Sequence, residues 1–128
     1  MATRYVALGD SISIDDYAGG PGRGGASLLY RNRDDDFPQW RGHDLMSQDP
    51  EATFQLLATD GATTSTLLDV QLPRLEALGI APTIVTLTIG GNDVLSAYGD
   101  TRAARATIRR VSQAVSRALE RLGASLAP

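Results

Sequence analysis

The sequence has 128 residues, with no cysteine, no lysine and a single histidine, His43. Without cysteine the chain forms no disulfide, no thiolate metal site and no thiol nucleophile, so a nucleophile must be an oxygen. We predict no metal and no cofactor. The basic residues are all arginine, which suits fixed hydrogen-bond geometry better than lysine, but this bias by itself indicates no function.

Basic residues are fewer than acidic residues in this chain. Twelve Lys and Arg residues against 15 Asp and Glu residues give a formal net charge of -3. Such a chain has no overall positive field to attract nucleic acid or an anionic membrane, so we predict no nucleic-acid partner. The first apolar run stops at Gly9 and is too short for a signal-peptide core or a membrane span. We expect no membrane span and a cytoplasmic location.

The rest of the composition is typical of a globular protein. Hydrophobic residues make up 42% of the chain and charged residues 21%. These values and the length fit one ordinary domain, and no internal repeat or linker interrupts the sequence. We therefore expect residues 1–128 to form a single domain.

Three apolar runs end in turns that contain glycine. The runs are typical of buried strands, and the third is rich in β-branched residues. The turns that follow them begin at Gly9, Thr59 and Gly90. The predicted strands cover residues 5–8, 54–58 and 83–89.

Helices are predicted between and after these strands. Thr63 or Thr64 is placed to cap a helix that runs through Leu72, and Pro73 starts a shorter helical stretch that Gly79 closes. Asp100 is a predicted N-cap of the last helix. Six apolar residues of this helix recur at helical spacing and predict its buried face: Ile108, Val111, Val115, Ala118, Leu119 and Leu122.

Less regular structure is expected between the first two strands. Residues 15–36 show no sustained apolar period and predict a long polar loop, with its glycine-rich part bordering the ligand-binding end of the sheet. Residues 37–46 predict a short helix in which Phe37, Trp40 and Leu45 pack. Asp34-Asp35-Asp36 indicates an acidic loop or helix start rather than a cation site. On the last helix, the arginines predict a solvated face rather than a phosphate-binding patch: Arg102, Arg105, Arg109 and Arg117.

Strands that alternate with helices predict a doubly wound α/β fold with a parallel sheet and right-handed crossovers. In such sheets ligands bind beyond the carboxyl ends of the strands. The three glycine turns follow those ends, so we expect them to meet in space.

The residues in these turns predict acyl-transfer chemistry. A sharp turn after the first strand presents the Ser11 hydroxyl to solvent and directs its backbone N–H to the same cleft. Gly61 brings a backbone N–H close to a ligand because it has no Cβ, and Asn92 offers a side-chain NH₂ group. Three such donors that converge on one point form an oxyanion hole.

Three segments resemble blocks I, II and III of the SGNH or GDSL hydrolase family, in the family's order and over nearly the whole chain: Gly9-Asp10-Ser11-Ile12-Ser13, Asp60-Gly61-Ala62-Thr63 and Gly90-Gly91-Asn92-Asp93. The resemblance implies a flavodoxin-like three-layer α/β/α fold and small ester substrates. It also implies that Ser11 is the nucleophile and an oxyanion donor, and that Gly61 and Asn92 are the other two donors. Lipase, thioesterase, carbohydrate esterase and lysophospholipase activities all remain open.

The chain departs from the family at its fourth block. Members carry an Asp-x-x-His segment near the C-terminus, whose histidine is the general base, and this sequence contains none. We expect a truncated domain that lacks the last strands of the sheet, exposes the edge of its third strand to self-association, and is nearly inactive. His43 is the one candidate for a substitute base, although Asp44 beside it is poorly placed to orient the imidazole. The alternative is a surface or partly packed histidine.

Two other functional classes are alternatives to an ester hydrolase. A non-catalytic module that binds a small ligand or a partner is favoured by the missing base, but it gives no chemical reason for the combination of Ser11, Gly61 and Asn92. A flavin- or nucleotide-binding protein needs a phosphate loop after the first strand, and Gly9-Asp10-Ser11-Ile12-Ser13 offers little of one.

Overall fold

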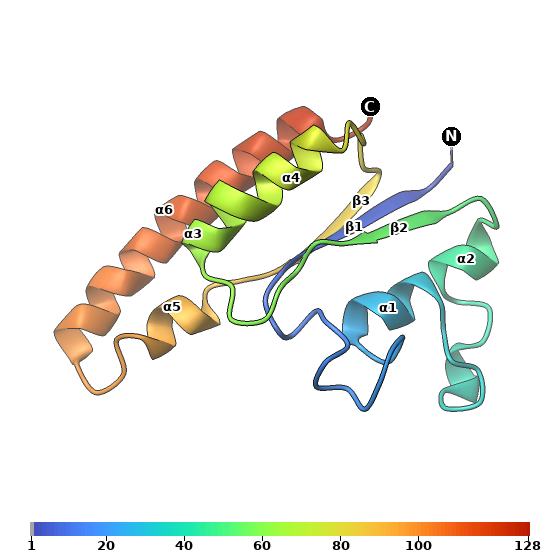
Figure 1. Ribbon diagram of the computed structural model, residues 1–128, viewed down its shortest axis with the longest axis horizontal. Coiled ribbons are helices and arrows are strands. Elements are labelled where there is room, and N and C mark those ends of the chain that lie inside the picture. Colours follow the sequence, from blue (N-terminus) through green and yellow to red (C-terminus); the bar gives the residue numbers. More distant parts are fainter. Residues whose placement is uncertain (1) are drawn as a thin grey trace.

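The computed structural model describes residues 2–128, and its centre is a sheet of three parallel strands (Figure 1). The strands are β1 (Arg4–Gly9), β2 (Thr53–Leu56) and β3 (Ile84–Thr88), arranged in the order β2-β1-β3. Helices lie between successive strands, so the predicted α/β class and the parallel sheet are confirmed. This strand order is that of the first three strands in a flavodoxin-like sheet.

The register places all three carboxyl ends at the same edge of the sheet. β1 pairs with β2 from Arg4↔Thr53 to Ala7↔Leu56, and with β3 from Tyr5↔Ile84 to Gly9↔Thr88. The first connection places β2 on one side of β1, and the second connection places β3 on the other side of β1. That reversal is the topological switch point, beside which ligands bind in folds of this kind.

The two crossovers cover opposite faces of the sheet (Figure 1). The β1–β2 connection contains α1 (Gly25–Tyr30), a 3₁₀ turn η1 (Pro38–Trp40) and α2 (Leu45–Gln48). The β2–β3 connection is one continuous helical segment made of α3 (Thr64–Thr66), a π-helical turn η2 (Leu67–Gln71) and α4 (Leu72–Ala77). After β3 come the short α5 (Gly91–Leu95) and the long α6 (Thr101–Ser125), which packs beside α3 and α4.

Side chains of β1 alternate between two cores because successive residues of a strand point to opposite faces. Val6 and Leu8 join a leucine-rich cluster under η2, α4 and α6, with Leu57, Leu67, Leu72, Leu75, Ala118 and Leu122. Tyr5 and Ala7 face Ala26 of α1 on the other side. There the ring of Phe54 stacks between Tyr5 and Tyr30, with centroid distances of 4.9 and 5.1 Å.

The connection between β1 and β2 is more ordered than its composition suggests. The predicted loop over residues 15–36 is wrong over Gly25–Tyr30, because α1 forms there and buries Ala26 against Tyr5 and Ala7. One turn and a half of helix is too short to show an apolar period. The predicted helix over residues 37–46 is divided into η1 and α2, and Gly42 between them has a φ of 79°. Trp40 is 57% exposed, so it does not pack as predicted, whereas Leu45 does.

The start of α6 is as predicted, and its predicted buried face is confirmed at Ala118 and Leu122 but not at Ile108 and Leu119. Asp100 is the N-cap and accepts a hydrogen bond from the N–H of Ala103 at 3.0 Å. Ile108 and Leu119 are 54% and 57% exposed, whereas the helix buries Thr107, Ala114, Ala118 and Leu122. Small residues let α6 approach α3 and α4 closely. This close packing, rather than the hydrophobicity of single residues, determines which face of α6 is buried.

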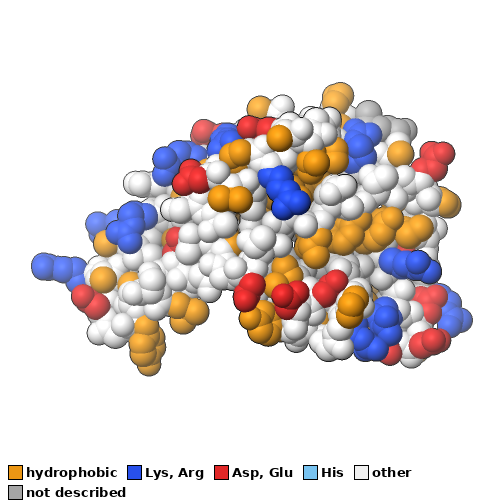
Figure 2. All heavy atoms as spheres, viewed as in Figure 1, with side chains coloured by type: hydrophobic (Ala, Val, Ile, Leu, Met, Phe, Trp, Pro, Cys, Tyr) orange, Lys and Arg blue, Asp and Glu red, His pale blue; other side chains and the backbone are white. Residues whose placement is uncertain are grey.

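Charged side chains of both signs are interspersed on the face drawn in Figure 2, without one positive patch. The four arginines of the predicted solvated face are exposed on α6: Arg102, Arg105, Arg109 and Arg117. Across residues 2–128, no helix has the length and apolar character needed to cross a membrane.

Candidate active site

The turn after β1 depends on glycine and on Thr88. Gly9 has a φ of 125°, and a Cβ at this position would lie 2.0 Å from the backbone O of Thr88. The backbone N–H of Asp10 donates to that same O at 2.9 Å. Only glycine permits β1 to turn this close to β3, and the turn brings Ser11 to the carboxyl end of the sheet.

Buried hydrogen bonds hold the residues on both sides of Ser11. Asp10 is 5% exposed, and its Oδ1 accepts hydrogen bonds from the N–H of Ile12 at 3.1 Å and from the hydroxyl of Thr88 at 3.0 Å. The hydroxyls of Ser13 and Thr88 lie 2.7 Å apart. Ser11 is half-buried, and neither its hydroxyl nor its N–H has a hydrogen-bond partner within residues 2–128.

The turn after β2 presents a second N–H group. Ala62 N–H bonds to the O of Thr59 at 3.3 Å, and Gly61 between them has a φ of 73° with no atom near the place of a Cβ. The N–H of Gly61 has no partner among the described residues. Tyr17 reaches this turn from the β1–β2 connection, with its hydroxyl 2.8 Å from Oδ2 of Asp60. This hydrogen bond raises the pKa of Tyr17.

The turn after β3 contacts the turn after β2 through two side chains. Gly90 has a φ of 108° and precedes α5. Nδ2 of Asn92 donates to the O of Ala62 at 2.9 Å, which leaves its second N–H without a partner in the described part of the chain. Asp93 accepts hydrogen bonds from the N–H and the hydroxyl of Thr64, at 3.0 and 2.7 Å. Asp93 therefore stabilises the start of α3, which lies 29 residues away in the sequence.

The three turns form a closed set of contacts. The first and second are joined by the hydrogen bond from Thr59 N–H to Gly9 O at 3.0 Å, and the first and third by the bond from Asp10 to Thr88. The bond from Asn92 to Ala62 joins the second and third. The turns that carry Ser11, Gly61 and Asn92 thus meet at one end of the sheet, with three N–H donors that these contacts do not use.

Sequence reasoning missed Gln71. This residue is 1% exposed, and its side-chain amide accepts from the N–H of Gly9 and donates to the O of Gly9, both at 2.8 Å. It also donates to Oγ1 of Thr59 at 3.1 Å. The available signal was its position, four residues from each of the buried Leu67 and Leu75, because a polar residue in an apolar stripe needs buried partners.

His43 lies in a different part of the molecule from these turns. Its ring meets the edge of Trp40, with centroids 6.2 Å apart, and it lines an apolar cavity of about 420 Å³ that α1 and η1 border. Neither Ser11, Gly61 nor Asn92 lines this cavity. Asp44 accepts hydrogen bonds from the N–H and hydroxyl of Ser47, at 3.2 and 2.7 Å, so its carboxylate is used as the N-cap of α2.

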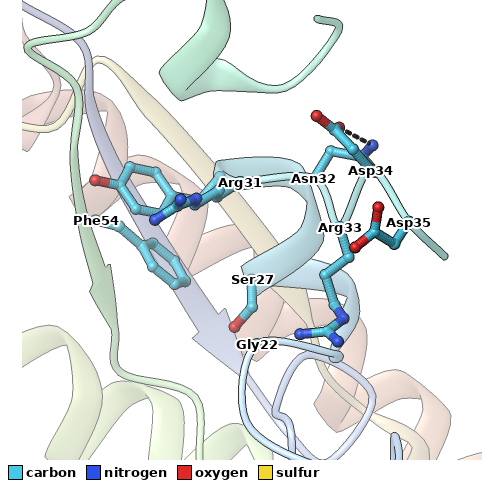
Figure 3. A pocket seen from close by; sticks show the side chains of 9 residues that line it. Gly22, Ser27, Arg31, Asn32, Arg33, Asp34, Asp35 and Phe54 are labelled. Atoms are coloured by element: carbon cyan, nitrogen blue, oxygen red, sulfur yellow. Dashed lines mark hydrogen bonds between the residues drawn. The ribbon is translucent and has the colours of Figure 1, made fainter. Parts of the chain in front are cut away.

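A second hollow of about 480 Å³ lies beside α1 and is shown in Figure 3. Asn32 donates to Asp34 there at 2.8 Å. The neighbouring Asp36 pairs with Arg33 and Arg23 at 2.6 and 3.1 Å, so arginines compensate the acidic triplet. No group of three or more His, Cys, Asp or Glu residues that could hold a metal ion occurs among residues 2–128.

The sequence matches the model of a known protein family. The model of the GDSL-like lipase/acylhydrolase family matches residues 7–127, a range that includes all three turns. No curated protein and no solved structure gives a significant match.

Proposed function

Because the chain belongs to the GDSL-like lipase/acylhydrolase family, we propose that it is an ester hydrolase that acts by acyl transfer through Ser11. The observation that carries the proposal is the set of unused donors at the joined turns: the N–H groups of Ser11 and Gly61 and one side-chain N–H of Asn92. Small esters are the proposed substrates.

In the proposed reaction, Oγ of Ser11 attacks the carbonyl carbon of the ester. The carbonyl oxygen gains negative charge, which the three N–H donors stabilise as an oxyanion hole. The bond to the alcohol oxygen then breaks, and the proton from Ser11 must reach that oxygen as it leaves. Water attacks the acyl-Ser11 ester in the second half of the reaction and returns the hydroxyl group.

This proton transfer needs a base, and these 128 residues contain one histidine. His43 lies against Trp40, and the contacts around it support no role at the three turns. We therefore propose that residues 1–128 alone are nearly inactive. Loss of triad members costs on the order of 10⁶ in kcat, with about 10³–10⁴ of catalysis over water left to the oxyanion hole and binding.

Chemical rescue tests the proposal. Imidazole in solution supplies a base, so hydrolysis of a short-chain p-nitrophenyl ester by the protein should rise with imidazole beyond the rise seen for imidazole alone. Ser11→Ala should abolish this extra rate, and Ser112→Ala, which changes an exposed serine on α6, should retain it. Equal extra rates in the Ser11→Ala variant and the unaltered chain would refute Ser11 as the nucleophile.

A non-catalytic binding module is the alternative, and the position of His43 favours it. This reading predicts binding of an ester without turnover and no response to imidazole. A further proposal concerns partners: the chain associates with a second copy of itself through the open edge of β3.

A further inference from the structure

Gln71 binds the backbone of β1 beyond the last residue pair between β1 and β2. The β1–β2 pairing stops at Ala7 and Leu56, whereas β1 continues to Gly9. There the N–H and C=O of Gly9 are bound by Oε1 and Nε2 of Gln71, both at 2.8 Å. A primary amide offers an acceptor and donors together, as a peptide group does. The side chain of Gln71 thus binds both polar groups of the Gly9 backbone, beside the N–H of Thr59, which also donates to the O of Gly9.

The same amide reaches the second turn. Nε2 of Gln71 donates to Oγ1 of Thr59, and the N–H of Thr59 donates to the O of Gly9. Gly9 lies two residues before Ser11, and Thr59 lies two residues before Gly61. One side chain therefore fixes the relative position of the two turns whose backbone N–H groups are unused.

The shape of the helical segment between β2 and β3 places the side chain of Gln71 beside β1. Pro73 has no N–H, and in a regular α-helix its ring crowds the carbonyl four residues earlier. Just before Pro73 the helix widens into the π-helical turn η2, in which the N–H of Leu72 bonds to the O of Leu67. Such turns are frequent at functional sites. Here the turn ends at Gln71, whose side chain is buried at the carboxyl end of β1.

We propose that Gln71 is a positioning residue that holds the N–H groups of Ser11 and Gly61 in register for acyl transfer. The effect of Gln71 on catalysis rests on the function proposed above. Its effect on the relative position of the two turns does not. An apolar side chain in its place leaves the N–H of Gly9 without a buried partner, so the first turn shifts relative to the second.

The geometric part is tested by NMR on the ¹⁵N-labelled protein with Gln71→Met, which keeps the length of the side chain and removes its polar atoms. The amide signals of Gly9, Ser11 and Gly61 should move, and the amide hydrogen of Gly9 should exchange about 5- to 10-fold faster. Gln113→Met, at an exposed glutamine of α6, should leave these signals in place. Unmoved signals at all three residues in folded Gln71→Met would overturn the inference.

A milder variant covers the case in which Gln71→Met does not fold. Thr59→Val removes only the 3.1 Å bond between Thr59 and Gln71, at an exposed residue. The signal of Gly61 should move in the same direction by a smaller amount. An unchanged amide signal of Gly61 in Thr59→Val also counts against a positioning role of Gln71.

The catalytic part is tested with the imidazole-stimulated rate. Misplaced donors should lower kcat by up to about 10²-fold with KM unchanged, whereas a merely structural residue lowers the melting temperature alone. A Ser11-dependent rate with an unaltered kcat in Gln71→Met would refute the inference. A rate that does not depend on Ser11, together with moved amide signals, would refute the proposed function and leave the positioning of the turns intact.

Discussion

The side chain of Asn92 and the backbone O of Ala62 are joined by a hydrogen bond of 2.9 Å, across 30 residues of sequence. This bond uses one N–H of the Asn92 amide and fixes the direction of the other. It also joins the turn after β3 to the turn that contains Gly61. Asn92 therefore has two separable effects, one on the stability of the site and one on its chemistry.

Replacing Asn92 by alanine should separate these effects. The loss of one hydrogen bond should lower the free energy of unfolding by about 1 kcal/mol, measured by urea denaturation. The loss of an oxyanion donor should lower the imidazole-stimulated, Ser11-dependent rate by about 10²–10³-fold. A rate within a factor of two of the unaltered protein, in a folded variant, would remove Asn92 from the proposed oxyanion hole.

Gly9 and Gly61 should respond differently to alanine although both have positive φ. At Gly9 the added Cβ meets the O of Thr88 at 2.0 Å, so strain and overpacking together should cost about 2–6 kcal/mol. At Gly61 no atom lies near the Cβ position, so only the left-handed conformation opposes alanine, at about 1–2 kcal/mol. Urea denaturation of both variants measures the difference, and equal costs would contradict the tight approach of Gly9 to β3.

Asp15 should make the protein sensitive to acid. Its carboxylate accepts hydrogen bonds from the N–H groups of Gly22 and Gly24 at 2.9 and 2.8 Å. Burial alone would raise the pKa of Asp15, but hydrogen bonds from Gly22, Ser27 and Gly24 outweigh burial and hold the pKa below its ordinary value of 3.8. A lowered pKa in the folded state gives stability that is present above pH 3.8 and is lost as the pH falls through the folded-state value.

The comparison with Asp15→Asn isolates this effect from the other carboxylates. The unaltered chain should exceed the variant in free energy of unfolding at pH 7, and the excess should shrink as the pH falls below 3.8. Urea denaturation at several pH values measures it. An excess that grows in acid would show that the carboxylate is not stabilised in the fold.

The open edge of β3 should lead to self-association. β3 is an edge strand of the described sheet, and Ile84 at its start is 36% exposed. Unpaired edge groups beside apolar side chains promote pairing between chains, and a charged residue on an edge opposes it. Sedimentation should show dimers or larger species, fewer of them in Ile84→Lys. A monodisperse monomer at high protein concentration would contradict this expectation.

The sheet and its turns could be predicted because their signals are local. Apolar runs followed by glycine mark the strands, and Thr63 and Asp100 are N-caps where the sequence places them. The carboxyl ends of parallel strands share one edge, so the meeting of the three turns follows from topology.

The rest of the fold and of the candidate site depends on tertiary packing, which no local sequence pattern predicts. The buried face of α6 follows Thr107 and Ala114 rather than Ile108 and Leu119, because the approach of α3 and α4 selects small residues. Likewise, the bond between Asp93 and Thr64 joins residues 29 positions apart, and only the fold brings them together. Such long-range polar contacts determine the candidate site as much as its motifs do.

The most direct test is to look for the acyl group itself. The protein is incubated with a p-nitrophenyl ester and imidazole, quenched in acid and analysed by peptide mass spectrometry, with Ser11→Ala treated in parallel. If Ser11 is the nucleophile, one acyl group is found on the peptide that contains Ser11, and none on the same peptide of the variant. Acylation at other residues alone, or equal acylation of both proteins, would contradict Ser11 as the nucleophile.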